Sequence, residues 1–398
     1  MGYIIRLKIM FCVYIHIPFC RHVCDYCDFR VMPSHSKLFA EYTDLLCKQI
    51  VTFGKGNPGV LASAKTLYLG GGTPSELPAE FLRQIFDCLA SAGLDVSKLS
   101  EISMEFNPES TSRESIQAAL DLGVNRISLG IQTFDATLLK TVGRVHSVEK
   151  GLEALNLLTS TPNLQVNADL MFDLPGQTVE GFLADVDRLS DFPLNHVSFY
   201  GLNVSPRSRL GHRVDRGELA VNEDLYEPMY MGGVDILERK GLNRYEVSNF
   251  ARPGFESAHN QNYWNRGEYI GFGPGAHSYL HGIRYYAPEI YPRWREYVNS
   301  GCPESALSVD RLRREDEIME FLWLSLRQTK GISPEGLRKL GISLDKSVCE
   351  RWIQKGFLTT ELLSNLLQIQ PGLRLSGRGW VFMDDIVTDL ANTYSNLD

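Results

Sequence analysis

The first two hundred residues alternate short apolar segments with amphipathic ones, and this alternation restricts the possible folds more than any other feature. The apolar segments are rich in Leu or β-branched residues, as in strands covered on both faces. The predicted strands are Cys12–Ile17, Thr66–Leu69, Glu101–Glu105, Arg126–Gly130, Leu164–Leu170 and His196–Tyr200. The predicted helices between them are Leu38–Val51, Ala79–Leu89, Ser112–Leu120, Val148–Leu158 and Thr178–Leu189.

Strands that alternate with helices build a parallel sheet with right-handed crossovers. Six such units are too few to close a barrel of eight. We therefore predict an α/β fold with an open, partial (β/α)6 barrel over residues 1–205, with its working face at the C-terminal ends of the strands.

Two further segments follow the predicted barrel. Residues 206–305 are dense in Gly, Pro, Asn and aromatic residues and have weak periodicity, so we expect an irregular, functional segment beside the barrel. Residues 306–398 become helical again and predict a small domain with a hairpin, similar to a winged helix, with a structural or partner-docking role. Its expected elements are Arg311–Leu326, Pro334–Leu340, Leu344–Lys355, Leu366–Ile369, Leu373–Leu375 and Trp380–Asn392.

Composition is that of an ordinary globular protein, with 43% hydrophobic and 22% charged residues. The net charge of −8 argues against non-specific nucleic-acid binding, which needs a basic surface. Arg6, Lys8 and His16 interrupt the apolar N-terminal stretch before it reaches the roughly twenty residues of a transmembrane helix. That stretch runs straight into a cysteine motif, so we do not expect a removable signal peptide. Arg6 stands where a myristoylation signal has Ser or Thr, so we do not expect a lipid anchor at Gly2. We expect a cytoplasmic protein.

Three of the eight cysteines crowd into one loop directly after the first predicted strand. Cys20, Cys24 and Cys27 have the spacing C-x3-C-x2-C, whereas the other five are scattered and indicate buried or incidental thiols. Three thiolates on one loop can hold three irons of a [4Fe–4S] cluster and leave the fourth iron open. The alternative is a zinc site completed by His22 or His35, although zinc ligands usually come as spaced pairs.

The cysteine loop and the turn Gly70–Pro74 resemble the radical S-adenosylmethionine (SAM) superfamily. The glycines follow the second predicted strand, where their backbone allows a ligand to approach closely. A tight strand-to-helix turn would also explain them, but the cysteine loop at the same barrel mouth favours a ligand. In that superfamily SAM chelates the open iron. An electron from the cluster then cleaves the sulfonium bond of SAM. The resemblance therefore implies a [4Fe–4S] cluster, SAM and an electron donor.

Polar residues lie at or just beyond the ends of the next predicted strands. Glu105, Gln132, Arg144 and Asp169 occupy these positions. Polar side chains at a barrel rim are badly placed for core packing and well placed for a ligand. Any one of them could cap a helix or tether a loop, but the set on one face predicts a binding site.

Longer motifs resemble the oxygen-independent coproporphyrinogen III oxidase family over about residues 12–300. They are Tyr14–Cys20 with Tyr26 and Cys27, Gly70–Pro74, Ser128–Gln132, and Asp169 with Leu174–Thr178. The resemblance implies that SAM is contacted by Tyr14, Gly71, Gly72, Thr73, Glu105, Gln132, Arg144 and Asp169, with Tyr26 on the adenine side. One departure is Asp173, where related sequences usually have Gly.

That family has two branches with different functions. One is the oxidase, which decarboxylates two propionates of coproporphyrinogen III, and the other, the HemW type, binds heme and passes it to acceptor proteins. The oxidase normally has a fourth cysteine two places after the third, and this chain has Phe29 at that position. The oxidase also has a long N-terminal extension before the motif, whereas only thirteen residues precede Tyr14 in this chain. We predict the heme chaperone. The alternatives are the oxidase and a radical SAM enzyme for another substrate.

The stretch His259–Trp264 resembles the H-N-x-x-Y-W signature of the HemW branch. Heme iron needs an axial donor, and the resemblance makes His259 the candidate, with Tyr263 and Trp264 able to pack on the flat macrocycle. The alternative is a histidine that tethers an irregular loop through hydrogen bonds. Weaker candidates for the axial ligand are His277, His281 and His22.

Overall fold

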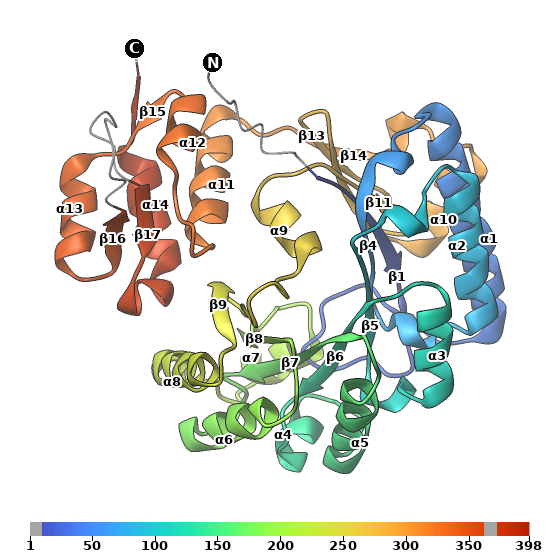
Figure 1. The fold of residues 1–398 in the computed structure, drawn as a ribbon, viewed down its shortest axis with the longest axis horizontal. Coiled ribbons are helices and arrows are strands. Elements are labelled where there is room, and N and C mark those ends of the chain that lie inside the picture. The colour runs from blue at the N-terminus through green and yellow to red at the C-terminus, as the bar shows by residue number, and fades with distance from the viewer. Residues whose placement is uncertain (1–9, 362–371, 398) are drawn as a thin grey trace.

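One curved sheet of twelve strands dominates the computed structural model, within the residues it describes, 10–361 and 372–397. Six neighbouring strands in the middle of this sheet are parallel and follow one another in chain order. They are β1 (Phe11–Ile17), β4 (Ala64–Gly71), β5 (Glu101–Phe106), β6 (Arg126–Gln132), β7 (Gln165–Phe172) and β8 (His196–Gly201). Figure 1 shows them curving into an open, partial barrel, which confirms the predicted fold class.

Helices cover the outer side of this barrel (Figure 1). They are α1 (Ser36–Gly56), α2 (Ala79–Ser91), α3 (Arg113–Asp121), the short α4 (Ala136–Thr141), α5 (Val148–Thr159) and α6 (Val179–Ser190). Ser112, Ser147 and Thr178 cap α3, α5 and α6 by accepting a hydrogen bond from a backbone N–H of the first turn. Such caps fix where each helix begins after its strand. No helix among the described residues is long and apolar enough to cross a membrane.

The segment 206–305 is more regular than predicted, and most of its strands extend the barrel sheet. On one edge, β10 (Asn249–Ala251) pairs antiparallel with β8 and carries β9 (Asn243–Glu246). On the other edge, β11 (Tyr269–Phe272) pairs parallel with β1 and carries an antiparallel meander. The remaining elements of the segment are α7 (Arg209–Asp215), α8 (Tyr226–Arg239), α9 (Ala258–Trp264), β12 (His277–Leu280), β13 (Ile283–Tyr286) and α10 (Tyr291–Asn299). The last strand of the meander, β14 (Ser308–Asp310), follows just after the segment. The expectation of an irregular segment is corrected accordingly.

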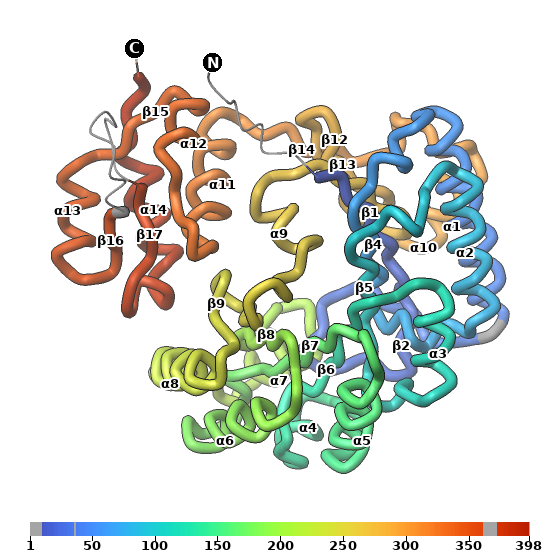
Figure 2. The backbone as a smooth tube through the Cα atoms, in the orientation of Figure 1, coloured from blue at the N-terminus to red at the C-terminus, as the bar shows by residue number. Residues whose placement is uncertain are grey.

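The C-terminal part forms a separate helical layer beside α9 and β9 (Figure 2). Its helices are α11 (Arg314–Leu326), α12 (Pro334–Lys339), α13 (Lys346–Gln354) and α14 (Met383–Thr393). An antiparallel hairpin joins β16 (Leu358–Glu361) to β17 (Gly372–Leu375), and β15 (Ile342–Ser343) pairs with β18 (Ser395–Asn396). This agrees with the predicted helices and hairpin, while the expected segment Leu366–Ile369 lies outside the described residues.

A buried ion pair connects this layer to the barrel sheet. Arg327, which caps the end of α11, places Nε 2.6 Å from a carboxylate oxygen of Glu246 at the end of β9. Glu246 is fully buried, and the Arg327 guanidinium also lies over the Trp264 ring at the end of α9. The position of the C-terminal layer is therefore fixed against β9 and the end of α9.

Candidate functional site

The cysteine loop lies at the C-terminal end of β1 and is closed at its base. β2 (Phe19–Cys20) pairs in parallel with β3 (Met32–Pro33), so the two ends of the loop are held together. Cys20, Cys24 and Cys27 are free and partly buried. Burial, together with the nearby Cys27 and Cys24, raises the pKa of the Cys20 thiol to about 11. The three sulfurs therefore lie close enough to affect one another electrostatically.

The two histidines proposed to complete a zinc site are placed differently. His35 caps α1, because its Nδ1 accepts a hydrogen bond from the Lys37 backbone, and His22 is exposed. In residues 10–361 and 372–397, no three His, Cys, Asp or Glu side chains are grouped to hold one metal ion. In a [4Fe–4S] cluster each cysteine binds a different iron, so its thiolates need not converge on one point. The arrangement favours a cluster over zinc.

Arg144 provides a buried positive charge beside the cysteine loop. One terminal nitrogen lies 3.5 Å from the Cys24 sulfur, and the other donates to the Gly130 carbonyl at 2.7 Å and the Asn107 side chain at 2.9 Å. Its Nε is buried without a hydrogen-bond partner among the described residues. A fixed cation with a spare donor suits a negatively charged group held by the cysteines.

The glycine turn after β4 packs directly against the cysteine loop. The Gly72 and Thr73 N–H groups donate to the Ile17 and Phe19 carbonyls, at 2.8 Å and 2.7 Å. A Cβ on Gly72 would lie 2.6 Å from the Phe19 carbonyl oxygen, closer than two such atoms can approach. The Thr73 hydroxyl lies 3.5 Å from the Cys20 sulfur. The turn is therefore both a tight connection and one wall of the cysteine site.

Glu105, near the end of β5, is a half-buried carboxylate that faces the barrel interior. It accepts hydrogen bonds from the Tyr68 hydroxyl at 2.8 Å and from the Gly71 N–H at 3.0 Å. Burial, with a contribution from the nearby Asp169, raises its pKa to about 7, although these hydrogen bonds oppose the rise. A carboxyl group poised near neutrality in a cavity is typical of a binding site.

Asp169 lies across the same interior cavity, which has a volume of about 360 Å³. Its carboxylate accepts hydrogen bonds from the Ser128 hydroxyl at 3.0 Å and the Asn167 side chain at 2.7 Å, and burial raises its pKa. Gln132 has a positive φ of 71° where β6 ends, and it accepts from the Tyr200 hydroxyl at 3.3 Å. The structure thus brings the polar strand ends to one side of the barrel.

Tyr26 and Tyr14, the two tyrosines predicted to contact SAM, have different neighbours. Tyr26 packs against a small apolar cluster that includes Leu138 and Leu202, while Tyr14 lies near Tyr68 on the β1 side. Asp173, the departure from the family pattern, is buried with a positive φ of 62°, and burial raises its pKa to about 6. Glycine adopts that conformation more easily than aspartate does.

His259 lies buried in the first turn of α9 and is held by hydrogen bonds. Its ring is 1% exposed, and both nitrogens have partners, the Thr66 hydroxyl at 2.7 Å and the Tyr263 hydroxyl at 2.8 Å. Its backbone N–H donates to Glu101, which receives the first N–H groups of α9. In the structure His259 tethers α9 to the sheet, which is the alternative, and its role as a heme ligand stays a prediction.

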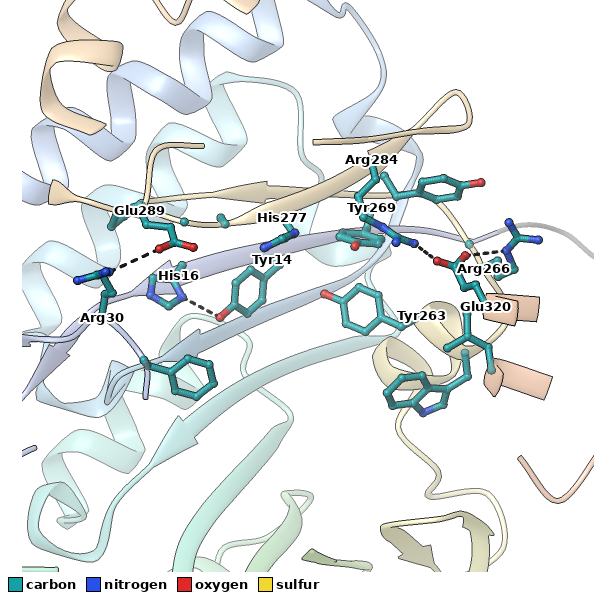
Figure 3. A pocket seen from close by; sticks show the side chains of 18 of the residues that line it. Tyr14, His16, Arg30, Tyr263, Arg266, Tyr269, His277, Arg284, Glu289 and Glu320 are labelled. Atoms are coloured by element: carbon teal, nitrogen blue, oxygen red, sulfur yellow. Dashed lines mark hydrogen bonds and ion pairs between the residues drawn. The ribbon is translucent and has the colours of Figure 1, made fainter. Parts of the chain in front are cut away.

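A cleft of about 670 Å³ beside the cysteine loop was not predicted from the sequence. It lies where β1, α9, α11 and the β12–β13 hairpin meet (Figure 3). Tyr14, Phe29, Tyr263 and His277 are among its lining residues. Because these residues are far apart in the chain, only the high aromatic content of residues 260–286 hinted at a surface of this kind.

Comparisons with known proteins agree with the cysteine loop and the barrel. Residues 14–189 match the Radical SAM superfamily. Heme chaperone HemW of Lactococcus lactis subsp. lactis (strain IL1403) is 38% identical over 323 residues, covering 81% of this chain and 83% of the relative. Heme chaperone HemW of Bacillus subtilis (strain 168) is 35% identical over 356 residues, 87% of this chain and 92% of the relative.

Among solved structures, coproporphyrinogen III oxidase (HemN) of Escherichia coli superposes with a TM-score of 0.80, covering 96% of this chain and 90% of that one. At 20% identity this likeness concerns the fold alone. The two HemW relatives have a higher sequence identity to this chain, 38% and 35%, and their matches extend beyond the barrel. This chain therefore belongs to the HemW family of radical SAM proteins.

Proposed function

We propose that this protein is a heme chaperone of the cytoplasm, which binds heme and passes it to acceptor proteins. The observation that carries the proposal is the identity of 38% over 81% of the chain to a protein named heme chaperone HemW. Phe29 supports the same choice, because it replaces the fourth cysteine of the oxidase branch.

In this proposal Cys20, Cys24 and Cys27 bind three irons of a [4Fe–4S] cluster. When bound, such a cluster supplies the electron that cleaves SAM in radical SAM chemistry. Arg144 lies 3.5 Å from the Cys24 sulfur and offsets negative charge on the thiolates. The hydroxyl of Thr73 lies 3.5 Å from the Cys20 sulfur and supplies a hydrogen bond there.

SAM would occupy the adjoining barrel mouth, where the polar strand ends converge. Glu105 and Asp169 present carboxylates whose orientation is fixed by neighbouring donors, so their remaining lone pairs can accept from ammonium or hydroxyl groups. Gly71 and Gly72 leave backbone exposed beside Glu105, and Tyr26 would provide an aromatic face for the adenine. Gln132 and Arg144 complete the set from β6 and the loop after α4.

The cluster assignment can be tested by anaerobic reconstitution of single cysteine variants. Alanine at Cys20, Cys24 or Cys27 should abolish the iron–sulfur absorption and bound iron, because each cysteine holds a separate iron. Cys349→Ala is the matched control, since this cysteine is partly buried in α13 of the C-terminal layer. A full cluster in any of the three variants would overturn the assignment.

The chaperone function can be tested against the oxidase alternative in one experiment. The reconstituted protein is given SAM, a reductant and coproporphyrinogen III beside a known oxidase, and separately heme followed by an apo heme protein. We expect heme binding and transfer without porphyrin product. Protoporphyrinogen formed at the rate of the control oxidase would overturn the proposal, as would the absence of heme binding.

A further inference from the structure

One side chain lies between the two groups that reach the sulfurs of the cysteine loop. Asn107 follows the last residue of β5, and its Nδ2 donates to the Thr73 hydroxyl at 2.8 Å. Its Oδ1 accepts from a terminal nitrogen of Arg144 at 2.9 Å. Thr73 and Arg144 in turn lie 3.5 Å from the sulfurs of Cys20 and Cys24. A single amide therefore joins both contacts to the cysteines.

The chemistry of these groups fixes the direction of each hydrogen bond. A guanidinium can only donate, so the amide oxygen of Asn107 must face Arg144 and its NH₂ group must face Thr73. The Thr73 hydroxyl accepts that hydrogen bond, which leaves its own single hydrogen for the Cys20 sulfur. A thiolate bound to iron has no proton to donate, so this is the direction that a cluster requires.

The position of Asn107 is itself constrained from several sides. It precedes Pro108, a position that favours extended backbone, and its φ of −110° and ψ of 151° are extended. Its carbonyl accepts from the Thr111 hydroxyl at 2.8 Å. Gly130 of β6 faces the side chain, and a Cβ there would lie 3.1 Å from Oδ1. The local backbone and the neighbouring strand therefore hold the amide between its two partners.

The two contacts bear on the charge of a bound cluster. Reduction adds one electron, so hydrogen bonds and positive charge at the cysteine sulfurs stabilise the reduced form and raise the reduction potential. Arg144 supplies the charge and Thr73 the hydrogen bond, each 3.5 Å from a different sulfur. Because hydrogen bonds weaken steeply when their geometry is poor, the residue that positions both donors influences the potential as well.

We propose that Asn107 is a positioning residue that sets the reduction potential of the cluster through Thr73 and Arg144. The inference rests on the cluster proposed for the cysteine loop. Aspartate has almost the same shape as asparagine but has no hydrogen to donate when it is ionised. In Asn107→Asp the Thr73 hydroxyl would turn its hydrogen toward the new carboxylate, and the added negative charge would offset that of Arg144. Both changes withdraw stabilisation from the reduced cluster.

The test is a redox titration of the anaerobically reconstituted full chain without SAM, followed by electron paramagnetic resonance of the reduced cluster. Asn107→Asp should keep the iron content and make one-electron reduction about tenfold less favourable, a shift of about 59 mV to lower potential. Asn125→Asp is the matched control, since its side-chain oxygen accepts from the Ile102 N–H at 2.8 Å near the other end of β5. This control adds the same charge at the opposite end of the strand and should leave the potential unchanged.

Two substitutions at Thr73 test the route from Asn107 to the Cys20 sulfur. Thr73→Val removes the hydroxyl and should lower the potential by part of the shift, whereas Thr73→Ser keeps the hydroxyl and should retain the unaltered potential. When Asn107→Asp and Thr73→Val are combined, the shift should be smaller than the sum of the two, because both act on the same hydrogen bond. Fully additive shifts would overturn the route through Thr73.

The outcomes separate this inference from the cluster assignment. If the unaltered chain assembles no cluster, the assignment fails and the inference with it. If Asn107→Asp assembles a full cluster at the unaltered potential, the inference is wrong and the assignment stands. Should that variant assemble too little cluster to titrate, Asn107→Leu provides a neutral side chain of similar shape, which should lower the potential by a smaller amount. An unchanged potential in Asn107→Leu, or loss of the cluster in both variants, would also overturn the inference.

Discussion

Replacing Glu105 with Gln should stabilise the ligand-free protein. The carboxyl pKa rises from an ordinary value of 4.5 to about 7, chiefly through burial. A group whose pKa is raised on folding contributes stability that is complete below pH 4.5 and is lost as the pH rises through 7. At 1.36 kcal/mol for each pKa unit, the buried charge lowers the free energy of unfolding by about 3 kcal/mol at pH 8.

The amide of Gln carries no charge and can keep both contacts. Its oxygen can accept from the Gly71 N–H, and its NH₂ group can donate to the Tyr68 hydroxyl, which also accepts. We therefore expect Glu105→Gln to gain about 3 kcal/mol at pH 8 but only about 1 kcal/mol at pH 5, where the folded wild-type group is already protonated. Thermal unfolding of the ligand-free chain at the two pH values measures the difference.

Glu101 on the same strand provides the opposite case. Its carboxylate accepts from the Ser257 hydroxyl and from the backbone N–H groups of Ala258 and His259, so an amide would turn its own N–H groups toward donors. Glu101→Gln should therefore cost about 1–3 kcal/mol at both pH values. If Glu105→Gln also destabilised the protein at pH 8, or gained equally at both pH values, the reasoning from the buried charge would be refuted.

The proposed SAM contact adds a second readout to the same variant. A hydrogen bond to a charged group is worth about 1.5–3 kcal/mol, so Glu105→Gln should weaken SAM binding by roughly tenfold to a hundredfold. The variant would then melt at a higher temperature without SAM and gain less from its addition. A purely structural role for Glu105 would leave the SAM-induced rise in melting temperature unchanged.

Two further predictions follow from close contacts. Arg327→Met leaves the buried Glu246 without its cation and should lower the free energy of unfolding by about 3–5 kcal/mol. Adding Glu246→Gln removes the unpaired charge and should recover part of that loss. Denaturant titrations of the two variants measure both effects. Gly72→Ala places a methyl group against the Phe19 carbonyl and should displace the cysteine loop, which would lower iron content after reconstitution while the circular dichroism of the barrel stays unchanged.

The barrel could be predicted because each of its strands is long enough for its composition to be evident and each is followed by an amphipathic helix. The added strands β9 to β13 have only three or four residues, too few for an alternating pattern to emerge. Helix α8 was missed for a different reason, since Gly232 and Gly233 lie inside it. A Cβ on Gly233 would lie 3.0 Å from the Phe182 ring, so glycine there allows α8 to pack tightly on α6.

The site residues divide in the same way. The cysteine spacing and the polar strand ends could be found because neighbouring parallel strands bring such positions together. The H-N-x-x-Y-W motif led to His259, and its residues also hold α9 in place: His259 and Tyr263 contact each other, and the Arg327 guanidinium lies over the Trp264 ring.

A continuous set of contacts joins the barrel interior to the cleft. Glu105 accepts from the Tyr68 hydroxyl, the Tyr68 ring stacks on Tyr14 at 6.2 Å, and the Tyr14 hydroxyl contacts His16. Tyr14 and His16 both line the cleft. If SAM binds at Glu105 and a second ligand occupies the cleft beside Tyr14, the two ligands lie at opposite ends of the same row of side chains. Any effect of SAM on the affinity for the second ligand must then be matched by an equal effect of that ligand on SAM affinity, because coupling free energies are reciprocal.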